Sequence, residues 1–116
     1  MRELLKPEQI DAGALQAMSS FHKDVVATVR EAVQGNHLVI VGMAQNPVVK
    51  KARKSLDEKG IAYKYLEYGN YLSMWKPRLA IKLWSGWPTF PQIFVDGKLI
   101  GGNDELQKHL ALGKIS

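Results

Sequence analysis

Apolar residues recur every four positions between residues 21 and 33 and predict an amphipathic helix. The apolar positions of this pattern are Phe21, Val25, Val29 and Val33. We expect the helix to begin at Ser19 or Ser20 and to end at Gly35, because glycine is common where helices stop. Residues 37–43 then contain an uninterrupted apolar run rich in β-branched residues, which is typical of a central strand buried on both faces.

A helix start signal lies directly after this strand. Asn46 is a favourable N-cap residue, and Pro47 suits the first helical position, where its missing N–H costs no hydrogen bond. The helix is expected to end at Gly60, and a second strand follows within residues 61–67. Residues 37–67 therefore predict a strand, helix, strand unit with a right-handed crossover between parallel strands.

The second half of the chain predicts a helix over residues 72–85, a hairpin and a terminal helix. The two hairpin strands, residues 93–95 and 98–100, are separated by Asp96 and Gly97, a pair that favours a tight turn. The last helix is expected from about residue 103 to residue 112.

These elements predict one domain over residues 19–116, preceded by an N-terminal extension or extra helix over residues 1–18. Their order predicts an α/β protein with a four-stranded mixed sheet flanked by helices on both faces. This is the plan of the thioredoxin-like fold. A chain of 116 residues has room for one such domain.

The chain contains no cysteine, which excludes disulfides, thiol nucleophiles and thiolate-held zinc or iron–sulfur sites. Three histidines remain, without the close spacing expected of metal ligands, so no metal site is predicted. The formal charge of +5 is well short of the dense basic tracts of nucleic-acid arms, and no nucleic-acid partner is expected.

No membrane partner is expected either. The longest apolar run, residues 38–41, is far shorter than the approximately 20 residues that span a bilayer. The N-terminal residues lack the charged and then apolar pattern of a secretory signal, and the expected location is the cytoplasm.

Residues 87–106, WPTFPQIFVDGKLIGGNDEL, closely resemble the glutaredoxin family and in particular its monothiol branch. Arg78 and Lys82 precede this stretch at the spacing of the basic pair of that branch, and the resemblance continues more weakly from about residue 21 to residue 112. It implies a groove for glutathione. The residues implied to line it are Arg78, Lys82, Thr89, Phe90, Pro91, Gly102, Asn103 and Asp104.

The resemblance also implies a role for each of these residues. Pro91 falls where the family has a cis proline that exposes the backbone of Phe90 for pairing with an extended peptide, with Thr89 lining the middle of the groove. A double glycine ending at Gly102 brings the start of the last helix to the γ-glutamyl end of the ligand. Asn103 and Asp104 would meet the γ-glutamyl carboxylate and amine, while Arg78 and Lys82 would hold the glycine carboxylate.

The catalytic motif of the family is absent. Its Cys-Pro-x-Cys stretch aligns with Asn46, Pro47, Val48 and Val49, so no residue is expected to be catalytic. An asparagine amide replaces neither the thiolate that attacks a disulfide nor the thiolate that helps to hold an iron–sulfur cluster. The family lysine before the motif is also missing, with Met43 in its place.

Simpler interpretations stand beside these. Asn46 and Pro47 are explained by ordinary helix capping, and Arg78 and Lys82 are also compatible with solvated charges on one helical face. The aromatic residues of the middle section are more often packing than a binding surface. These residues are Tyr63, Tyr65, Tyr68, Tyr71, Trp75, Trp84 and Trp87.

The sequence thus favours a glutaredoxin-like protein that binds glutathione, a related γ-glutamyl or extended peptide, or a protein partner of the redox or iron–sulfur systems. We expect this protein to require no cofactor and to perform no thiol–disulfide exchange. The alternatives are a glutathione-dependent thiol–disulfide oxidoreductase and an accessory protein in iron–sulfur cluster handling.

Overall fold

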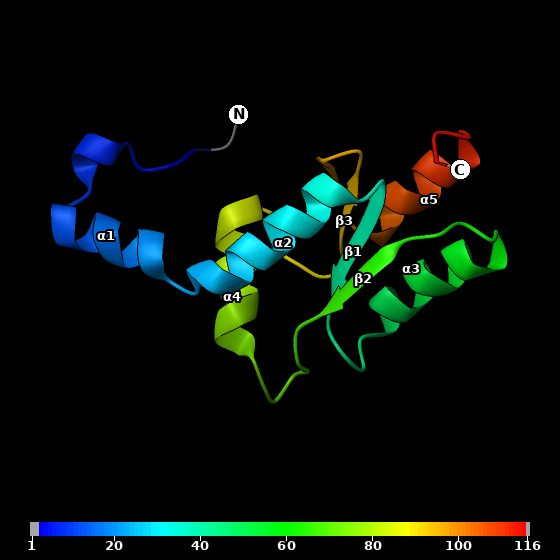
Figure 1. Cartoon of the computed structure of the whole chain (residues 1–116), viewed down its shortest axis with the longest axis horizontal. Helices are drawn as coiled ribbons and strands as arrows, with labels where there is room; N and C mark the ends of the chain where they lie inside the picture. Colours follow the sequence, from blue (N-terminus) through cyan, green and yellow to red (C-terminus); the bar gives the residue numbers. More distant parts are fainter. Residues whose placement is uncertain (1–2, 116) are drawn as a thin grey trace.

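The computed structural model describes residues 3–115, so residues 1, 2 and 116, which the expected domain boundaries include, lie outside the described part. Figure 1 shows the elements in chain order. They are η1 (Pro7–Gln9), α1 (Ala12–Ser20), α2 (Lys23–Gly35), β1 (Leu38–Gly42), α3 (Pro47–Glu58), β2 (Lys64–Glu67), α4 (Trp75–Ser85), β3 (Gln92–Val95), β4 (Lys98–Gly101) and α5 (Asn103–Ala111).

The four strands form one mixed sheet in the order β2-β1-β3-β4. Strand β1 pairs in parallel with β2, with Ile40 opposite Tyr65, and antiparallel with β3, with Ile40 opposite Ile93. The predicted crossover unit and hairpin are therefore confirmed. The hairpin turn places Asp96 and Gly97 at φ 51° and 79°, the left-handed conformation that Asp-Gly turns adopt readily.

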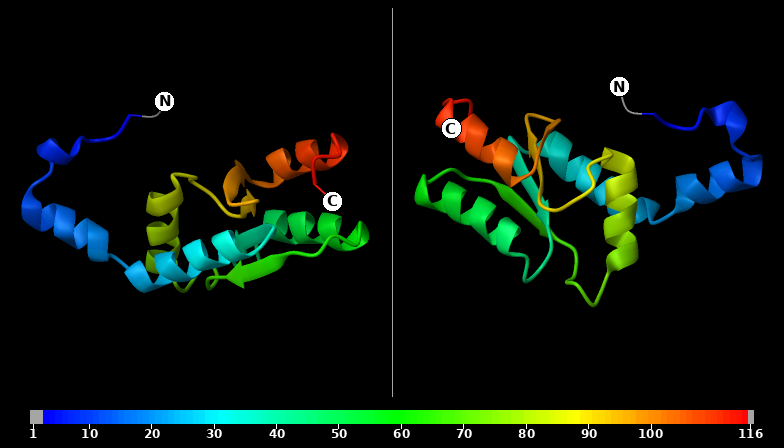
Figure 2. Two further views of the ribbon diagram at one scale, coloured as in Figure 1. Left: turned by 45° about the horizontal axis from the view of Figure 1, so that its top comes forward. Right: turned by 180° about the vertical axis from the view of Figure 1, so that it is seen from behind.

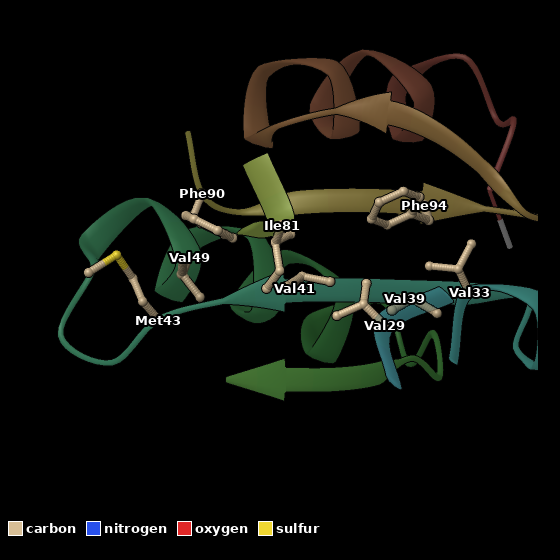
Figure 3. Packing of buried hydrophobic residues seen from close by; sticks show 9 residues of the cluster. All are labelled: Val29, Val33, Val39, Val41, Met43, Val49, Ile81, Phe90 and Phe94. Atoms are coloured by element: carbon tan, nitrogen blue, oxygen red, sulfur yellow. The ribbon is translucent and has the colours of Figure 1, made fainter. Parts of the chain in front are cut away.

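Helices cover both faces of the sheet. Because successive side chains of β1 point to opposite faces, this strand contributes to two core layers. Val39 and Val41 face helices α2 and α4 and pack with Phe94 from β3, as Figure 3 shows. Leu38 and Ile40 face helices α3 and α5. The first of these layers contains Val29, Val33, Val39, Val41, Met43, Val49, Ile81, Phe90 and Phe94. The second contains Leu38, Ile40, Ala52, Leu56, Ile93, Leu106 and Ile115.

The expected helix start at Ser19 or Ser20 is wrong. Helix α1 already occupies Ala12–Ser20, and the chain breaks before α2 begins at Lys23, with His22 in the left-handed region at φ 46°. The four-residue apolar repeat crosses this break because Phe21 has the right spacing without belonging to α2. Neither η1 nor α1 contains a buried residue, and α1 extends away from the sheet as an arm (Figures 1 and 2).

Within residues 3–115, no helix combines the length and apolar character needed to cross a membrane.

Candidate functional site

Asn46 caps helix α3 at the position that aligns with the first cysteine of the family's Cys-Pro-x-Cys motif. Its Oδ1 accepts hydrogen bonds from the backbone N–H of Val48 at 2.9 Å and of Val49 at 3.0 Å, and Pro47 occupies the first turn. The capping interpretation is therefore confirmed. The first-turn N–H groups that would stabilise a thiolate instead bond to this neutral amide, so this helix start holds no reactive group.

A groove of about 290 Å³ lies beside this cap. Three separate segments form its walls: the start of α3, the turn that leads into β3, and the start of α5. Its lining residues are Val48, Trp87, Thr89, Phe90, Pro91, Gly102, Asn103, Asp104 and Glu105. Six of the eight predicted ligand residues are thus brought together, and Arg78 and Lys82 are not among the lining residues.

The turn before β3 supplies one wall of the groove. The Phe90–Pro91 peptide bond is cis, as the resemblance implied. The Phe90 ring is buried, whereas its backbone N–H and C=O form no hydrogen bond within residues 3–115. Gln92 is fully buried and stabilises the turn, because its Nε2 donates a hydrogen bond to the carbonyl of Trp87 at 3.0 Å. This wall therefore combines an apolar ring with unpaired backbone groups.

The start of helix α5 supplies the opposite wall. Gly101 has φ 123°, and a Cβ there would lie 2.6 Å from Glu105 Cγ, so this turn requires glycine. Glu105 reaches back, and its Oε1 accepts from the N–H of Gly102 at 2.9 Å. This backbone hydrogen bond lowers the pKa of Glu105 below its ordinary value. An acid three residues after the cap is a recognised helix-start signal, and it would have found Glu105.

Trp87 lines the groove, although the sequence favoured only a packing role for it. Its Nε1 is buried and has no hydrogen-bond partner among the described residues, and a Cβ built on Gly102 would lie 3.6 Å from it. A buried donor of this kind is normally paired. Trp87 therefore contributes a buried, unpaired N–H beside Gly102 at the edge of the groove.

Arg78 is held inside the fold. It is 8% exposed, and its Nη1 donates to the carbonyls of Tyr68 at 2.9 Å and Ser73 at 2.6 Å, in the loop between β2 and α4. The interpretation of Arg78 as a solvated charge is therefore wrong. Lys82, one turn later, is partly exposed, with Nζ 5.6 Å from the centre of the Phe90 ring. Lys82 thus adjoins the groove, whereas Arg78 ties α4 to the preceding loop.

Among the residues that the structure describes, no group of three or more histidine or acidic side chains is placed to hold a metal ion. The side chains that line the groove include one amide, two carboxylates, one hydroxyl and an indole, and none of the lining residues is basic. The chain is an α/β protein of the thioredoxin-like class with a small groove between the start of α3, the turn before β3 and the start of α5.

Comparison with known proteins narrows this class to one family. The profile of the family described as Glutaredoxin matches residues 47–100. A glutaredoxin-like protein from Dictyostelium discoideum is 51% identical over 98 residues, which cover 84% of this chain and 80% of that protein. The chain belongs to the glutaredoxin family.

Two further proteins agree with this assignment. A chloroplastic bifunctional monothiol glutaredoxin from Arabidopsis thaliana is 38% identical over 66 residues, covering 53% of this chain and 21% of that protein. The crystal structure of a buckwheat glutaredoxin–glutathione complex superimposes with a TM-score of 0.68 at 25% identity, covering 79% of this chain and 84% of that chain. The similarity thus includes the monothiol branch, and the thioredoxin-like fold is confirmed.

Proposed function

We propose that this protein binds glutathione, or another γ-glutamyl or extended peptide, as a non-covalent ligand and performs no thiol–disulfide exchange. The observation that carries the proposal is the groove between Thr89 and Asp104, which joins six residues that the resemblance assigned to glutathione. The structural neighbour with bound glutathione supports the same ligand class. The groove of this chain has a volume of about 290 Å³, which is at the small end of ligand sites and suits a tripeptide.

The two walls of the groove suit the two halves of such a peptide. The unpaired backbone N–H and C=O of Phe90 would pair with the extended middle of the ligand as a short added strand, beside Thr89. The first-turn amides at Asn103 and Asp104 would receive the γ-glutamyl carboxylate, and the Asp104 carboxylate would receive its amine.

The glycine carboxylate at the far end needs a cation. The sequence assigned this role to Arg78 and Lys82 together, and we propose that Lys82 supplies most of it. Lys82 is partly exposed beside Phe90, whereas an Nη1 of Arg78 already donates to two loop carbonyls. Arg78 would contribute mainly by holding α4, and hence Lys82, in place.

Binding without reaction follows from the cap. With no cysteine thiol on the protein, no mixed disulfide forms, and affinity depends on a few polar contacts that must overcome the entropy of association. We expect a Kd for glutathione of roughly 0.1 to several mM. The oxidoreductase alternative lacks the thiol that it needs, and an accessory protein in iron–sulfur cluster handling would have to act without holding the cluster, because ligation needs thiolates. Turnover of a glutathione mixed disulfide by the purified chain alone, or a stable cluster chromophore after anaerobic reconstitution, would overturn the proposal.

Titration of ¹⁵N-labelled protein with glutathione tests the binding. The amide signals of Phe90, Asn103 and Asp104 should shift together and saturate within the millimolar range. Gly102→Val should abolish these shifts, because its added carbons point toward Pro91 and Trp87 in the groove. The matched control is Gly35→Val, since a Cβ at Gly35 meets nothing within 4 Å. The absence of shifts at roughly 20 mM glutathione, or equal shifts in the Gly102→Val protein, would contradict the proposal.

A further inference from the structure

Helix α4 carries a row of exposed apolar side chains on the face opposite its buried one. Trp75, Leu79 and Leu83 are four residues apart and are 59%, 37% and 66% exposed, while Ile81 is fully buried against the sheet. Residues at this spacing share one side of a helix. Trp75 thus departs from the packing interpretation of the aromatic residues. The result is an apolar helix face without a cover among the described residues.

The N-terminal arm faces this helix with apolar side chains of its own. A cleft of about 440 Å³ separates the arm from helices α2 and α4. Leu4 and Met18 line it from the arm and Leu83 and Trp84 from α4, all of them more than a third exposed. Leu15 precedes Met18 by one turn of α1 and is 41% exposed. Figure 2 shows the arm beside α2 and α4, well away from α3 and α5.

The arm and α4 gather more exposed apolar side chains than isolated surface residues do. Those exposed by more than a third include Leu4, Leu15, Met18, Leu79, Leu83 and Trp84. Four of them line the cleft. The apolar row of α4 continues past the cleft to Trp75, which favours an extended macromolecular occupant over a small molecule.

Charge selects among possible partners. Helix α2 lines the cleft with Lys23, Val26 and Arg30, which lie on one helical face, and the lining residues include no acidic side chain. The whole chain carries a formal charge of +5, so a second copy would bring further positive charge to two cations. An acidic partner would instead pair with them.

We propose that the cleft between the N-terminal arm and helices α2 and α4 binds an amphipathic helix of another protein, with acidic residues flanking its apolar face. Large side chains at positions i, i+3 or i+4 and i+7 of that helix would pack against Met18, Leu83 and Trp84. Its carboxylates would lie beside Lys23 and Arg30. The cleft shares no lining residue with the glutathione groove, so this inference stands independently of the proposed function.

Two synthetic amphipathic peptides of equal length test this inference. Both carry leucine at the apolar positions, and their polar positions hold glutamate in one and lysine in the other. Isothermal titration calorimetry with the full chain should give a Kd of roughly 10–100 µM for the glutamate peptide and at least tenfold weaker binding for the lysine peptide. Double reversal, Lys23→Glu with Arg30→Glu, should invert this preference. Equal binding of both peptides, or of neither, would overturn the proposal.

Paired variants separate the cleft from general surface stickiness. Leu83→Asp should weaken binding of the glutamate peptide at least tenfold, whereas Leu112→Asp should leave it unchanged. Leu83 and Leu112 are 66% and 68% exposed, and only Leu83 lines the cleft. Identical effects of the two substitutions would contradict the assignment. Sedimentation analysis adds a further outcome: dimers of the unmodified chain that Leu83→Asp dissociates would show that a second copy occupies the cleft.

Discussion

Replacing Arg78 with methionine should destabilise the fold, because this buried side chain joins α4 to the loop that precedes it. Methionine keeps the apolar stem and removes the guanidinium, leaving the carbonyls of Tyr68 and Ser73 without their donor. A hydrogen bond from a charged donor contributes about 1.5–3 kcal/mol, and the loop carbonyls regain part of this from water. We therefore expect Arg78→Met to lower the free energy of unfolding by about 2–4 kcal/mol.

Urea denaturation followed by far-UV circular dichroism measures this change from the shift in midpoint at constant m-value. The matched control is Lys82→Met, one turn further along the same helix, where a partly exposed side chain is lost. It should change the free energy of unfolding by less than about 0.5 kcal/mol and weaken glutathione binding instead. The reasoning is refuted if Arg78→Met is as stable as Lys82→Met and loses glutathione binding, because Arg78 would then be a ligand residue and not a structural one.

Three further predictions follow from the groove and its supports. Asn46→Cys places a thiol at the start of α3, where the backbone N–H groups of Val48 and Val49 stabilise a thiolate. This variant should reduce a glutathione mixed disulfide in an assay coupled to glutathione reductase. Loss of the Asn46 cap should lower the free energy of unfolding by about 1 kcal/mol. A folded but inert variant would show that the groove no longer positions the disulfide. The folded protein lowers the pKa of Glu105, so the ionised carboxylate stabilises the fold above its ordinary pKa of 4.5 and loses that effect as the pH falls. The urea midpoints of wild type and Glu105→Gln should therefore differ at pH 7 and converge in acid. A difference in midpoint that does not depend on pH would contradict this prediction. Gly101→Ala should clearly lower the thermal unfolding midpoint, because φ is 123° and the added Cβ would lie 2.6 Å from Glu105. In the control Gly102→Ala the Cβ makes only ordinary contacts at 3.5 Å, so the midpoint should change little. Equal midpoints for the two variants would refute the strain assigned to Gly101.

The sequence predicted those parts of the fold that local rules control. The Asn46 cap, the parallel crossover unit and the turn at Asp96 and Gly97 each depend on a few neighbouring residues, and each was found where it was expected. The strand boundaries moved by one to three residues. Strand β2, for example, begins only at Lys64. Local propensities set the kind of element, whereas pairing with β1 sets its ends.

Features that depend on distant contacts were not predictable in this way. The break before α2 requires the left-handed conformation of His22, and no apolar spacing signals it. The burial of Arg78 depends on two carbonyls in a loop whose course the sequence does not specify. The groove residues were identified through family resemblance, because residues near 48, 90 and 104 meet only once the sheet is formed. The sequence predicted an extension or extra helix over residues 1–18 but not its cleft, because the residues that line the cleft come from the arm, α2 and α4 and meet only in the folded protein.

The most direct test of the central claim is a crystal structure of the unmodified chain with glutathione at tens of millimolar. The account predicts electron density in the groove, with the peptide paired to the backbone of Phe90, the γ-glutamyl end at Asn103, the glycine end toward Lys82, and no bond to the protein. An empty groove at that concentration, or glutathione bound only elsewhere on the molecule, would contradict the claim that this glutaredoxin retains a peptide site without the catalytic thiol.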